Sequence, residues 1–579
     1  MEDTGRVPVG GWTGCYGHVR FDAADTRLFR AEVPFGHRPS RPGASRLAVQ
    51  WRASGTPGIP APADDECLLL TGVITGPVTR EWVQRTASAL KAGRYAHLAA
   101  VPGELAGCLV TERKVYLFRS ATSNEGLLYR RDGPLLRWST DPSDLLDGPR
   151  EFDQETIWRC CRGDMVFVYR DMQPVLPGQV VIMDSDTTTT VEYDPIAPLD
   201  LPRRTPLAQY ARTAYELILE AVRPYAGCGR IGILLSGGLD SSAVLTALVE
   251  CGADVTAYHQ ATDDPLADES GYAREVCEHL GVPFVPVMMD HGDGYLSERW
   301  EFPHPYNNMA FRWLEQIADR IQHDGITFLT WGRDGDMVFG PTRYGLHDVL
   351  YGDLSLREKA ALSRGLLCSR WELSRILRSI APSSSLLDDY LPTGDNARAT
   401  DFLTPRAGVP DDRFDDAYSA REHCVDLTVW RPRGLQLCNP LGTKDLRRLT
   451  ARMPNAYRLL PYQGRMITKP VLRLILSTRL PERIWRRYGR LWLDSPHKNY
   501  VLAHREVFAD LIGRPDSHLV RMGVVDPRRL TEVLSEPMLL RRNAEPLLNA
   551  AMTELFLRSD ARRAPATVKG STDATRATG

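Results

Sequence analysis

The sequence has almost no net charge that would attract a charged partner. Its 71 Lys and Arg residues balance 73 Asp and Glu residues, which leaves a formal charge of −2 over 579 residues. A protein without a strong overall field is not drawn to nucleic acid or to an anionic membrane, and the sequence predicts neither as a partner. Ordinary fractions of hydrophobic (43%) and charged (25%) residues also exclude a wholly disordered or fibrous chain.

Long apolar runs and ordered cysteine patterns are also missing. No run of about 18 apolar residues occurs, and the first residues, MEDTGRVPVGGWTG, have neither the basic start nor the apolar core of a secretory signal. The 11 cysteines include no CxxC pair and no Cys/His spacing of a zinc site, which argues against a metal cluster or a disulfide framework. These absences predict a protein of the reducing cytoplasm, and the adjacent Cys160 and Cys161 are expected in a strand.

Lysine is scarce, because nearly all of the basic residues are arginine. The lysines are Lys91, Lys114, Lys359, Lys444, Lys469, Lys498 and Lys569. A lysine retained in such a chain is a better candidate for a point-charge role than one lysine among many.

The pattern of the chain changes at residues 184–206, a stretch rich in Thr, Asp and Pro. Before it, residues 1–183 contain short apolar runs separated by turn signals, such as the hairpin dipeptide Asp132-Gly133. After it, residues 207–560 alternate apolar runs with helical patterns, which is typical of a parallel, doubly wound sheet. We therefore predict an α/β protein with an antiparallel β-rich amino-terminal domain, a linker over 184–206, a doubly wound domain with extra helices, and a disordered tail over 561–579.

The sharpest chemical signal is the segment IGILLSGGLDSS at Ile231–Ser242. An apolar strand, a glycine-rich turn and a helix start follow one another, so backbone N–H groups, serine hydroxyls and the positive end of a helix dipole can face one anion. The GxxxxGK[ST] pattern of kinase and GTPase loops is absent. The predicted phosphate-binding residues are Leu235, Ser236, Gly237, Gly238, Leu239, Asp240, Ser241 and Ser242.

The carboxylate of Asp240 would repel phosphate unless a cation lay between them. Magnesium is the natural intermediary, because it accepts carboxylate and phosphate oxygens together. The alternative is purely structural: a turn of small residues in which Asp240 only caps the following helix. The complete order of strand, SGGxDS and amphipathic helix favours the phosphate-binding interpretation.

SGGLDSS resembles the pyrophosphate-binding loop of the asparagine synthetase superfamily of ATP pyrophosphatases. Further segments are similar to this family: DESGYAREVCEHLGVPF at Asp268–Phe284, GRDGDMVFG at Gly332–Gly340, RMITKPVLR at Arg465–Arg473 and LPERIWRR at Leu480–Arg487. The resemblance implies ATP as cosubstrate, with Gly332 at the nucleotide and Asp336 as a second Mg²⁺-binding acid beside Asp240. GELAGCLV, KVYLFRSATSNEGLLYR and LRWSTDPSDLL are similar to the family's glutaminase-type domain, which implies an Ntn-type fold for the amino-terminal part.

One departure from the family concerns the source of the amine. Family glutaminases use an amino-terminal Cys whose own α-amine is the base, whereas the matching position is Gly10 and Cys15 lies inside the chain. The resemblance therefore implies that the protein does not take ammonia from glutamine.

Two subfamilies use an amine within the substrate: β-lactam synthetases and lasso-peptide cyclases. The chain length, the loop and the carboxyl-terminal pattern are most similar to the lasso-peptide cyclases.

Other departures affect the residues expected to react. Arg333 replaces a Glu or Tyr of the family and Gln436 replaces an acid, so acid–base chemistry is not expected at either position. The lysine that the family places after LP-x-x-x-x-x-R is missing, and Arg490 or Lys498 can take its place. For Lys469 two roles remain open, a phosphate contact and a structural salt bridge. The predicted catalytic residues are Asp240, Asp336, Lys469 and Arg490.

The resemblance implies an ATP-dependent amide ligase. Such an enzyme adenylates an Asp or Glu side chain of a precursor core peptide and closes a macrolactam with the peptide's N-terminal amine, releasing AMP and pyrophosphate. The implied partners are the core peptide, a leader peptidase and a leader-binding protein. Three alternatives remain: a β-lactam synthetase-like ligase, an ammonia-dependent asparagine synthetase-like ligase, and a catalytically silent peptide-binding scaffold.

Overall fold

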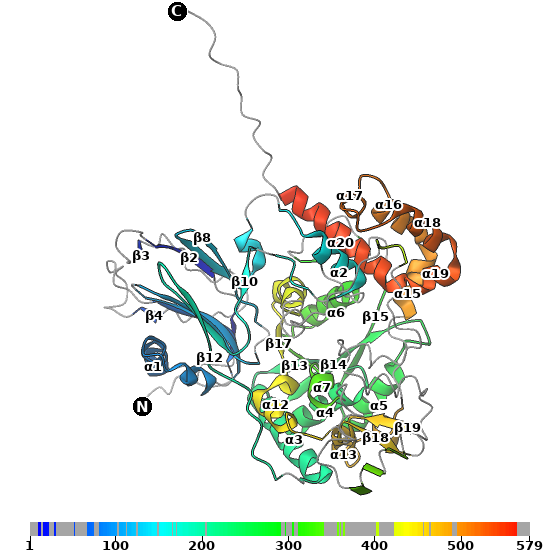
Figure 1. Ribbon diagram of the computed structural model, residues 1–579. Helices are drawn as coiled ribbons and strands as arrows, with labels where there is room; N and C mark the ends of the chain where they lie inside the picture. Colours follow the sequence, from blue (N-terminus) through cyan, green and yellow to red (C-terminus); the bar gives the residue numbers. More distant parts are fainter. Residues whose placement is uncertain are drawn as a thin grey trace, which may run out of the picture.

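The computed structural model describes, with short gaps, residues 80–290, 311–340, 401–404, 422–488 and 495–563. It also describes strands between residues 10 and 74, Leu296, His304, Pro305 and a few residues from 356 to 364. Antiparallel sheets form the amino-terminal part and a parallel sheet flanked by helices follows (Figure 1). The fold class is therefore α/β, as predicted.

The amino-terminal part contains two antiparallel sheets. One has the order β1-β5-β6-β7-β11-β12 with β4 paired to β5, and the other has the order β10-β8-β9-β2-β3. Buried side chains from both sheets, among them Cys108, Leu117 and Trp138, form one apolar cluster. The strands are β1 (Gly10–Trp12), β2 (Tyr16–Phe21), β3 (Leu28–Phe29), β4 (Trp51–Arg52), β5 (Cys67–Ile74), β6 (Gly103–Val110), β7 (Val115–Arg119), β8 (Leu128–Asp132), β9 (Leu135–Ser139), β10 (Gln173–Pro174), β11 (Gln179–Met183) and β12 (Thr188–Glu192).

The hairpin at Asp132-Gly133 is confirmed. Strands β8 and β9 pair in antiparallel fashion around it, and Gly133 has φ 59°, a conformation that glycine adopts without strain. Strand β12 lies within the stretch 184–206 and extends the first sheet to Glu192. The predicted disordered tail begins too early, because residues 561–563 still belong to helix α20 (Ala544–Arg563). Residues 564–579 lie outside the described residues, and the domain boundaries stay a prediction.

The strand expected at Cys160-Cys161 is wrong, because both residues lie on helix α2 (Gln154–Arg162). The Asp153 side chain accepts a hydrogen bond from the Thr156 N–H at the start of this helix, and Gly163, at φ 88°, ends it in the left-handed region. Both thiols are buried, and burial raises the pKa of each. They therefore stay protonated and act as apolar packing groups.

The second part is built on a five-stranded parallel sheet of order β15-β14-β13-β16-β17. Its strands are β13 (Arg230–Leu234), β14 (Asp254–Ala261), β15 (Phe284–Met288), β16 (Phe328–Trp331) and β17 (Gln436–Cys438). Side chains of β14 alternate between two cores: Ala257 belongs to one apolar cluster and Tyr258 to another. Helices therefore cover both faces, as the doubly wound prediction requires.

The two helical layers are made of different parts of the chain. One face is covered by α3 (Leu207–Val222), α4 (Leu239–Glu250), α5 (Ser270–Leu280), α12 (Lys444–Thr450) and α13 (Pro470–Leu476). The core of the other face includes α2, α6 (Phe311–His323), η4 (Asp426–Trp430), α15 (Ser495–Ala503), α16 (Arg505–Ile512), α17 (His518–Arg521), α18 (Pro527–Ser535), α19 (Pro537–Arg542) and α20 (Ala544–Arg563). Helix α2 of the amino-terminal part packs on α20, so the two parts of the chain share this core (Figure 1).

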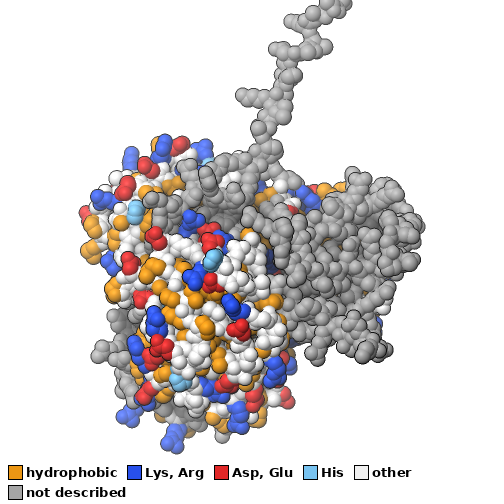
Figure 2. Space-filling model, turned by 180° about the vertical axis from the view of Figure 1, so that it is seen from behind, with side chains coloured by type: hydrophobic (Ala, Val, Ile, Leu, Met, Phe, Trp, Pro, Cys, Tyr) orange, Lys and Arg blue, Asp and Glu red, His pale blue; other side chains and the backbone are white. Residues whose placement is uncertain are grey.

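Charges of both signs are mixed over one face of the molecule. Figure 2 shows Lys, Arg, Asp and Glu side chains interspersed over the described part of one face. Within the part of the chain that the structure describes, no helix combines the length and the apolar character needed to cross a bilayer.

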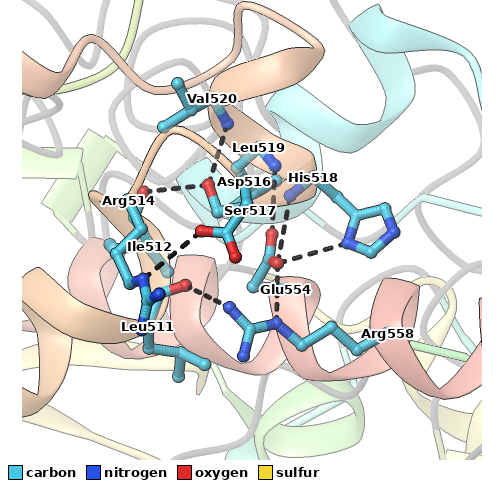
Figure 3. Close-up of polar contacts among 10 residues, drawn as sticks. All are labelled: Leu511, Ile512, Arg514, Asp516, Ser517, His518, Leu519, Val520, Glu554 and Arg558. Atoms are coloured by element: carbon cyan, nitrogen blue, oxygen red, sulfur yellow. Dashed lines mark hydrogen bonds and ion pairs between the residues drawn. The ribbon is translucent and has the colours of Figure 1, made fainter.

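A buried carboxylate organises the carboxyl-terminal helices. Glu554 on α20 is fully buried and accepts hydrogen bonds from the backbone N–H groups of His518 and Leu519 and from Arg558 Nε, at 2.9–3.0 Å (Figure 3). Burial by itself would raise the pKa of the Glu554 carboxyl, but the hydrogen bonds from His518 and Arg558 hold it below its ordinary value of 4.5. Glu554 thus joins α20 to α17 in its ionised form.

Replacing Glu554 with Gln is expected to lower the free energy of unfolding by about 1.5–3 kcal/mol at pH 7, because hydrogen bonds to a charged acceptor are lost. A carboxyl whose pKa is lowered by folding stabilises the protein above its unfolded pKa and loses this contribution as the pH falls through the folded pKa. The difference between wild type and variant should therefore shrink below pH 4.5, as measured by chemical denaturation across a pH series.

Asp516, which lies just before the start of α17, provides a matched control (Figure 3). Its side chain is 74% exposed and pairs with Arg514 at 3.3 Å. Exposed pairs contribute little, so Asp516→Asn should change stability by less than about 0.5 kcal/mol. An equal effect of the two substitutions, or a Glu554→Gln effect that grows on acidification, would contradict the role given to Glu554.

Candidate functional site

The site lies where the strand order of the parallel sheet reverses. From β13 the chain proceeds outward through β14 to β15, and it then returns to place β16 on the opposite side of β13. Parallel sheets bind ligands in the crevice beyond the carboxyl ends of their strands at such a switch point. The segments that follow β13 and β16 both begin there.

The predicted phosphate loop follows β13 and leads into α4. Gly237 has φ 71°, and the Gly238 N–H donates to Ser236 Oγ at 3.2 Å. The Ser236 N–H donates to Ser241 Oγ at 3.3 Å, so the loop closes on the first turn of the helix. A glycine-rich turn in front of a helix N-terminus can bind an anion through backbone N–H groups and the helix dipole.

The segment after β16 packs directly on this loop. A Cβ at Gly332 would lie 2.4 Å from the Ser241 nitrogen, and a Cβ at Gly335 would lie 2.2 Å from Oδ1 of Asp240. Only glycine allows backbones to approach this closely. Because the two segments touch, Asp240 and Asp336 come to the same edge of the sheet, although they are far apart in the sequence.

Lys469 joins these two acids. Its Nζ lies 2.6 Å from Oδ1 of Asp336 and also contacts Oδ2 of Asp240. Lys469 is 4% exposed, whereas the Asp336 side chain is 61% exposed. A buried ammonium requires compensating charge, and the two carboxylates provide it. Of the two roles left open by the sequence, the salt bridge is present.

The turn that carries Lys469 is held on both sides. Lys469 has φ 55°, which is uncommon for a residue other than glycine, and its N–H donates to the Arg458 carbonyl at 2.8 Å. Arg473 donates to the carbonyls of Thr468 at 2.7 Å and Trp485 at 2.6 Å. The arginine of the K-x-x-LR pattern is therefore structural: it ties the Lys469 turn to α14 (Glu482–Trp485).

Sequence analysis missed Asp334, which anchors the loop after β16. Asp334 is 7% exposed and has φ 61°. Its Oδ2 accepts hydrogen bonds from Asn439 Nδ2 at 2.9 Å and Arg447 Nη2 at 3.1 Å. Both acids of the GRDGD segment look alike in the sequence, and only long-range partners distinguish the buried Asp334 from the exposed Asp336.

Arg333 lies in a buried group of charges beside the site. Its Nη1 is 3.6 Å from Oε2 of Glu422, its Nε is 3.7 Å from Oδ1 of Asp334, and its guanidinium lies 5.6 Å from the ring centre of Trp331. Arginine does not give up its proton in proteins. This position can bind or orient an anionic group, but it cannot act as a base.

Two groups of side chains support the SGGLDSS loop. Tyr272 on α5 lies under Gly237 and is covered by the Arg487 guanidinium, 4.1 Å from its ring centre, while Arg487 also pairs with the buried Glu269. His259 Nδ1 is 2.7 Å from the Leu235 carbonyl. Burial lowers the pKa of His259, so the neutral ring donates from Nδ1 to this carbonyl and fixes the end of β13.

The structure brings together most of the predicted site residues. Leu235–Ser242, Gly332, Asp336 and Lys469 meet at one edge of the sheet. Arg490 lies outside the described residues. Lys498 lies on α15. The next residue, Asn499, donates a hydrogen bond from Nδ2 to Oδ2 of Asp264 at 3.1 Å, so α15 contacts the loop after β14.

The two acids are compatible with a magnesium ion. Among the described residues, no group of three or more His, Cys, Asp or Glu side chains is arranged to hold a metal. Mg²⁺ does not need such a cage, because it commonly binds one or two protein carboxylates and completes its shell with phosphate oxygens and water. Asp240 and Asp336, whose oxygens converge on one ammonium group, fit this requirement.

Comparison with known proteins identifies the class of this domain. Residues 214–362 match the asparagine synthase family model, so the chain contains an asparagine synthase domain over this segment. The match includes the SGGLDSS loop with Asp240, and also Gly332 and Asp336. Lys469 lies beyond it.

A more particular similarity links the chain to the microcin J25-processing protein McjC of Escherichia coli. The two are 40% identical over 58 residues, which is 10% of this chain and 11% of McjC. The glutamine phosphoribosylpyrophosphate amidotransferase from B. subtilis and a structure described as the allosteric regulatory enzyme of purine biosynthesis also align, each over 48% of this chain and 85% and 84% of their own. Their TM-scores of 0.22 and 0.21 at 9% identity are too low to support a conclusion.

Proposed function

We propose that the protein is an ATP-dependent ligase that activates a peptide carboxylate as an acyl-adenylate and joins it to the amine of the same peptide. The observation that carries the proposal is the convergence of the SGGLDSS loop, Asp240, Asp336 and the buried Lys469 at the switch point of the parallel sheet. Backbone donors, two acids and a buried cation at one edge are groups that can stabilise the charge that develops as pyrophosphate leaves.

Asp240 and Asp336 would hold Mg²⁺ in this site. The bound ion would offset the negative charge of the ATP phosphates, which the chain's own cations only partly balance. The N–H groups of the Gly237-Gly238 turn and the N-terminus of α4 would bind the β- and γ-phosphates. Lys469 would supply a positive charge from a backbone that its neighbours already hold in place.

In the proposed reaction, an oxygen of the substrate carboxylate attacks the α-phosphorus of ATP, and the bond to the β-phosphate oxygen breaks. Pyrophosphate leaves, and the carboxyl group becomes a mixed anhydride with AMP. The peptide's N-terminal amine then attacks the activated carbonyl, loses its proton and expels AMP. Overall, one ATP is converted into AMP and pyrophosphate, and the peptide loses one water.

Two observations favour a substrate that carries its own amine. The position where family glutaminases have their nucleophilic Cys is Gly10, at the start of β1, and glycine has no nucleophilic side chain. The local similarity to McjC, a protein named for processing microcin J25, favours a lasso-peptide cyclase among such ligases. A leader peptidase and a leader-binding protein would then be needed to deliver the core peptide.

The test is a reconstituted reaction of purified protein, ATP, Mg²⁺, candidate precursor peptides and the leader peptidase. We expect AMP and pyrophosphate by chromatography, and a peptide product whose mass is that of the linear core less one water, formed without glutamine or ammonia. ADP as the nucleotide product would remove the protein from this chemistry. Adenylation of free aspartate or a small β-amino acid, with no dehydrated peptide, would identify a small-molecule ligase instead. No nucleotide turnover with retained peptide binding would identify a scaffold.

A further inference from the structure

A cation of the protein's own already lies between the two acids proposed for magnesium. Lys469 Nζ contacts Oδ2 of Asp240 and lies 2.6 Å from Oδ1 of Asp336. We propose that Lys469 is a positioning residue that takes the place of the metal between these carboxylates in the nucleotide-free protein and leaves it when Mg²⁺ and ATP bind together. The proposal rests on the magnesium site of the proposed function.

The ammonium group and a metal ion compete for the same space. Mg²⁺ binds carboxylate oxygens at about 2.0–2.1 Å, and the oxygens in question are the ones that face Lys469 Nζ. Two cations in a partly buried site also repel each other more strongly than they would in water. A metal that uses both inward-facing oxygens must therefore displace the lysine head group.

The lysine can move only through its side chain. The Lys469 N–H donates to the Arg458 carbonyl at 2.8 Å, and the Lys469 carbonyl accepts from the Arg473 N–H at 3.1 Å. The next residue, Pro470, is the first residue of α13. The backbone is therefore held, whereas the four-carbon stem can swing its head group toward another anion.

A new anion must be present before the lysine can leave the acids. Lys469 is 4% exposed, and a buried ammonium without a counter-charge is strongly disfavoured. The triphosphate of ATP supplies such a charge beside the SGGLDSS loop, whereas a metal ion alone does not. Steric access is not the obstacle, because the Asp336 side chain is 61% exposed. Metal and nucleotide should therefore bind with positive coupling, and each should raise the affinity for the other by the same factor.

The experiment measures Mn²⁺ binding by electron paramagnetic resonance, with and without α,β-methylene ATP, which cannot release pyrophosphate. Wild type should bind Mn²⁺ at least about tenfold more tightly with the analogue than without it, within the usual range of coupling between sites. Lys469→Met should bind Mn²⁺ without nucleotide at least about tenfold more tightly than wild type. Adding Asp336→Asn to Lys469→Met should remove this gain, because one of the two acids is gone.

A stability measurement gives a second readout of the same competition. Mn²⁺ alone should raise the melting temperature of Lys469→Met but not that of wild type, because only a ligand that binds the folded state stabilises it. Lys444→Met is the matched control: Lys444 pairs with Asp194 at another place in the fold, and its loss should leave Mn²⁺ affinity unchanged.

Equal Mn²⁺ affinity of wild type with and without the analogue would overturn the proposal, and so would a folded Lys469→Met variant that gains no affinity. If Lys469→Met does not fold, the wild-type comparison alone decides. Release of AMP and pyrophosphate by wild type tests the ligase function separately, so a failure of the lysine proposal can be distinguished from a failure of the proposed function.

Discussion

Replacing Asp240 with Asn is expected to lower the rate of AMP formation by about 10²–10³-fold, the usual effect of removing one group that stabilises developing charge. The substitution keeps the shape of the side chain but removes the negative charge proposed to hold Mg²⁺. Lys469 keeps its contact with Asp336, so the fold should survive. The measurement is AMP release at saturating ATP and substrate, with circular dichroism as a check of folding.

Asp254 offers a control on the same sheet. It begins β14 and is exposed at the edge opposite to the site. Asp254→Asn should retain wild-type turnover, whereas Asp336→Asn should lose activity as Asp240→Asn does. A residual rate within tenfold of wild type in a well-folded Asp240→Asn variant would argue against the role of this acid.

Replacing Arg431 with Leu is expected to lower the free energy of unfolding by roughly 3–5 kcal/mol, the usual cost of breaking a buried ion pair from one side. Arg431 contacts Glu125 of the amino-terminal part and lies 2.5 Å from Oδ2 of Asp426 on η4. Burial by itself would lower the pKa of the Arg431 guanidinium, but the two carboxylates raise this pKa above its ordinary value. The substitution leaves both acids without this cation.

The same contact region contains a neutral histidine. Burial is the main cause that lowers the pKa of His423 to about 4, and the positive charge of the nearby Arg431 is the second. The Nε2 of His423 is hydrogen-bonded to the Thr140 carbonyl. A Cβ at Gly126 would lie 2.4 Å from the His423 ring. The two parts of the chain therefore meet through close packing and buried polar contacts, adjacent to Glu422 and the Arg333 cluster.

Calorimetry of Arg431→Leu should show a lower melting temperature, or two transitions in place of one if the amino-terminal part unfolds separately. The control is Arg514→Leu, because Arg514 is 61% exposed and pairs with an exposed Asp516; it should change stability by less than about 0.5 kcal/mol. If both variants melted alike, the buried pair would not stabilise the contact between the two parts.

Features coded by neighbouring residues could be predicted from the sequence. The strand, glycine turn and helix of Ile231–Ser242 form as β13, a loop and α4, and Asp132-Gly133 forms its hairpin. The alternation of apolar runs with helical patterns predicted the parallel sheet correctly, because an α-helix and a buried strand place their apolar residues at different periods.

Features that depend on distant partners could not be predicted in this way. Cys160 and Cys161 were expected in a strand, but they lie on helix α2, whose packing surface is α20 near the other end of the chain. The residues that cap α2, Asp153 and Gly163, are local signals that sequence analysis overlooked. Asp334 was overlooked because its role depends on Asn439 and Arg447, more than a hundred residues further along the chain.

The sequence by itself determined the class of the fold and the position of the SGGLDSS loop between β13 and α4, because helix periods, turn dipeptides and a glycine-rich loop act over a few adjacent residues. Only the tertiary structure decided which charged groups meet there. Lys469 and Asp240 are separated by 229 residues, and their contact exists because β13 and β16 are neighbours at the switch point and the β18–β19 hairpin (Leu459–Tyr462 and Arg465–Thr468) presents the lysine to that edge. Side chains of equal charge look alike in a sequence; burial and the surrounding counter-charges give each its role.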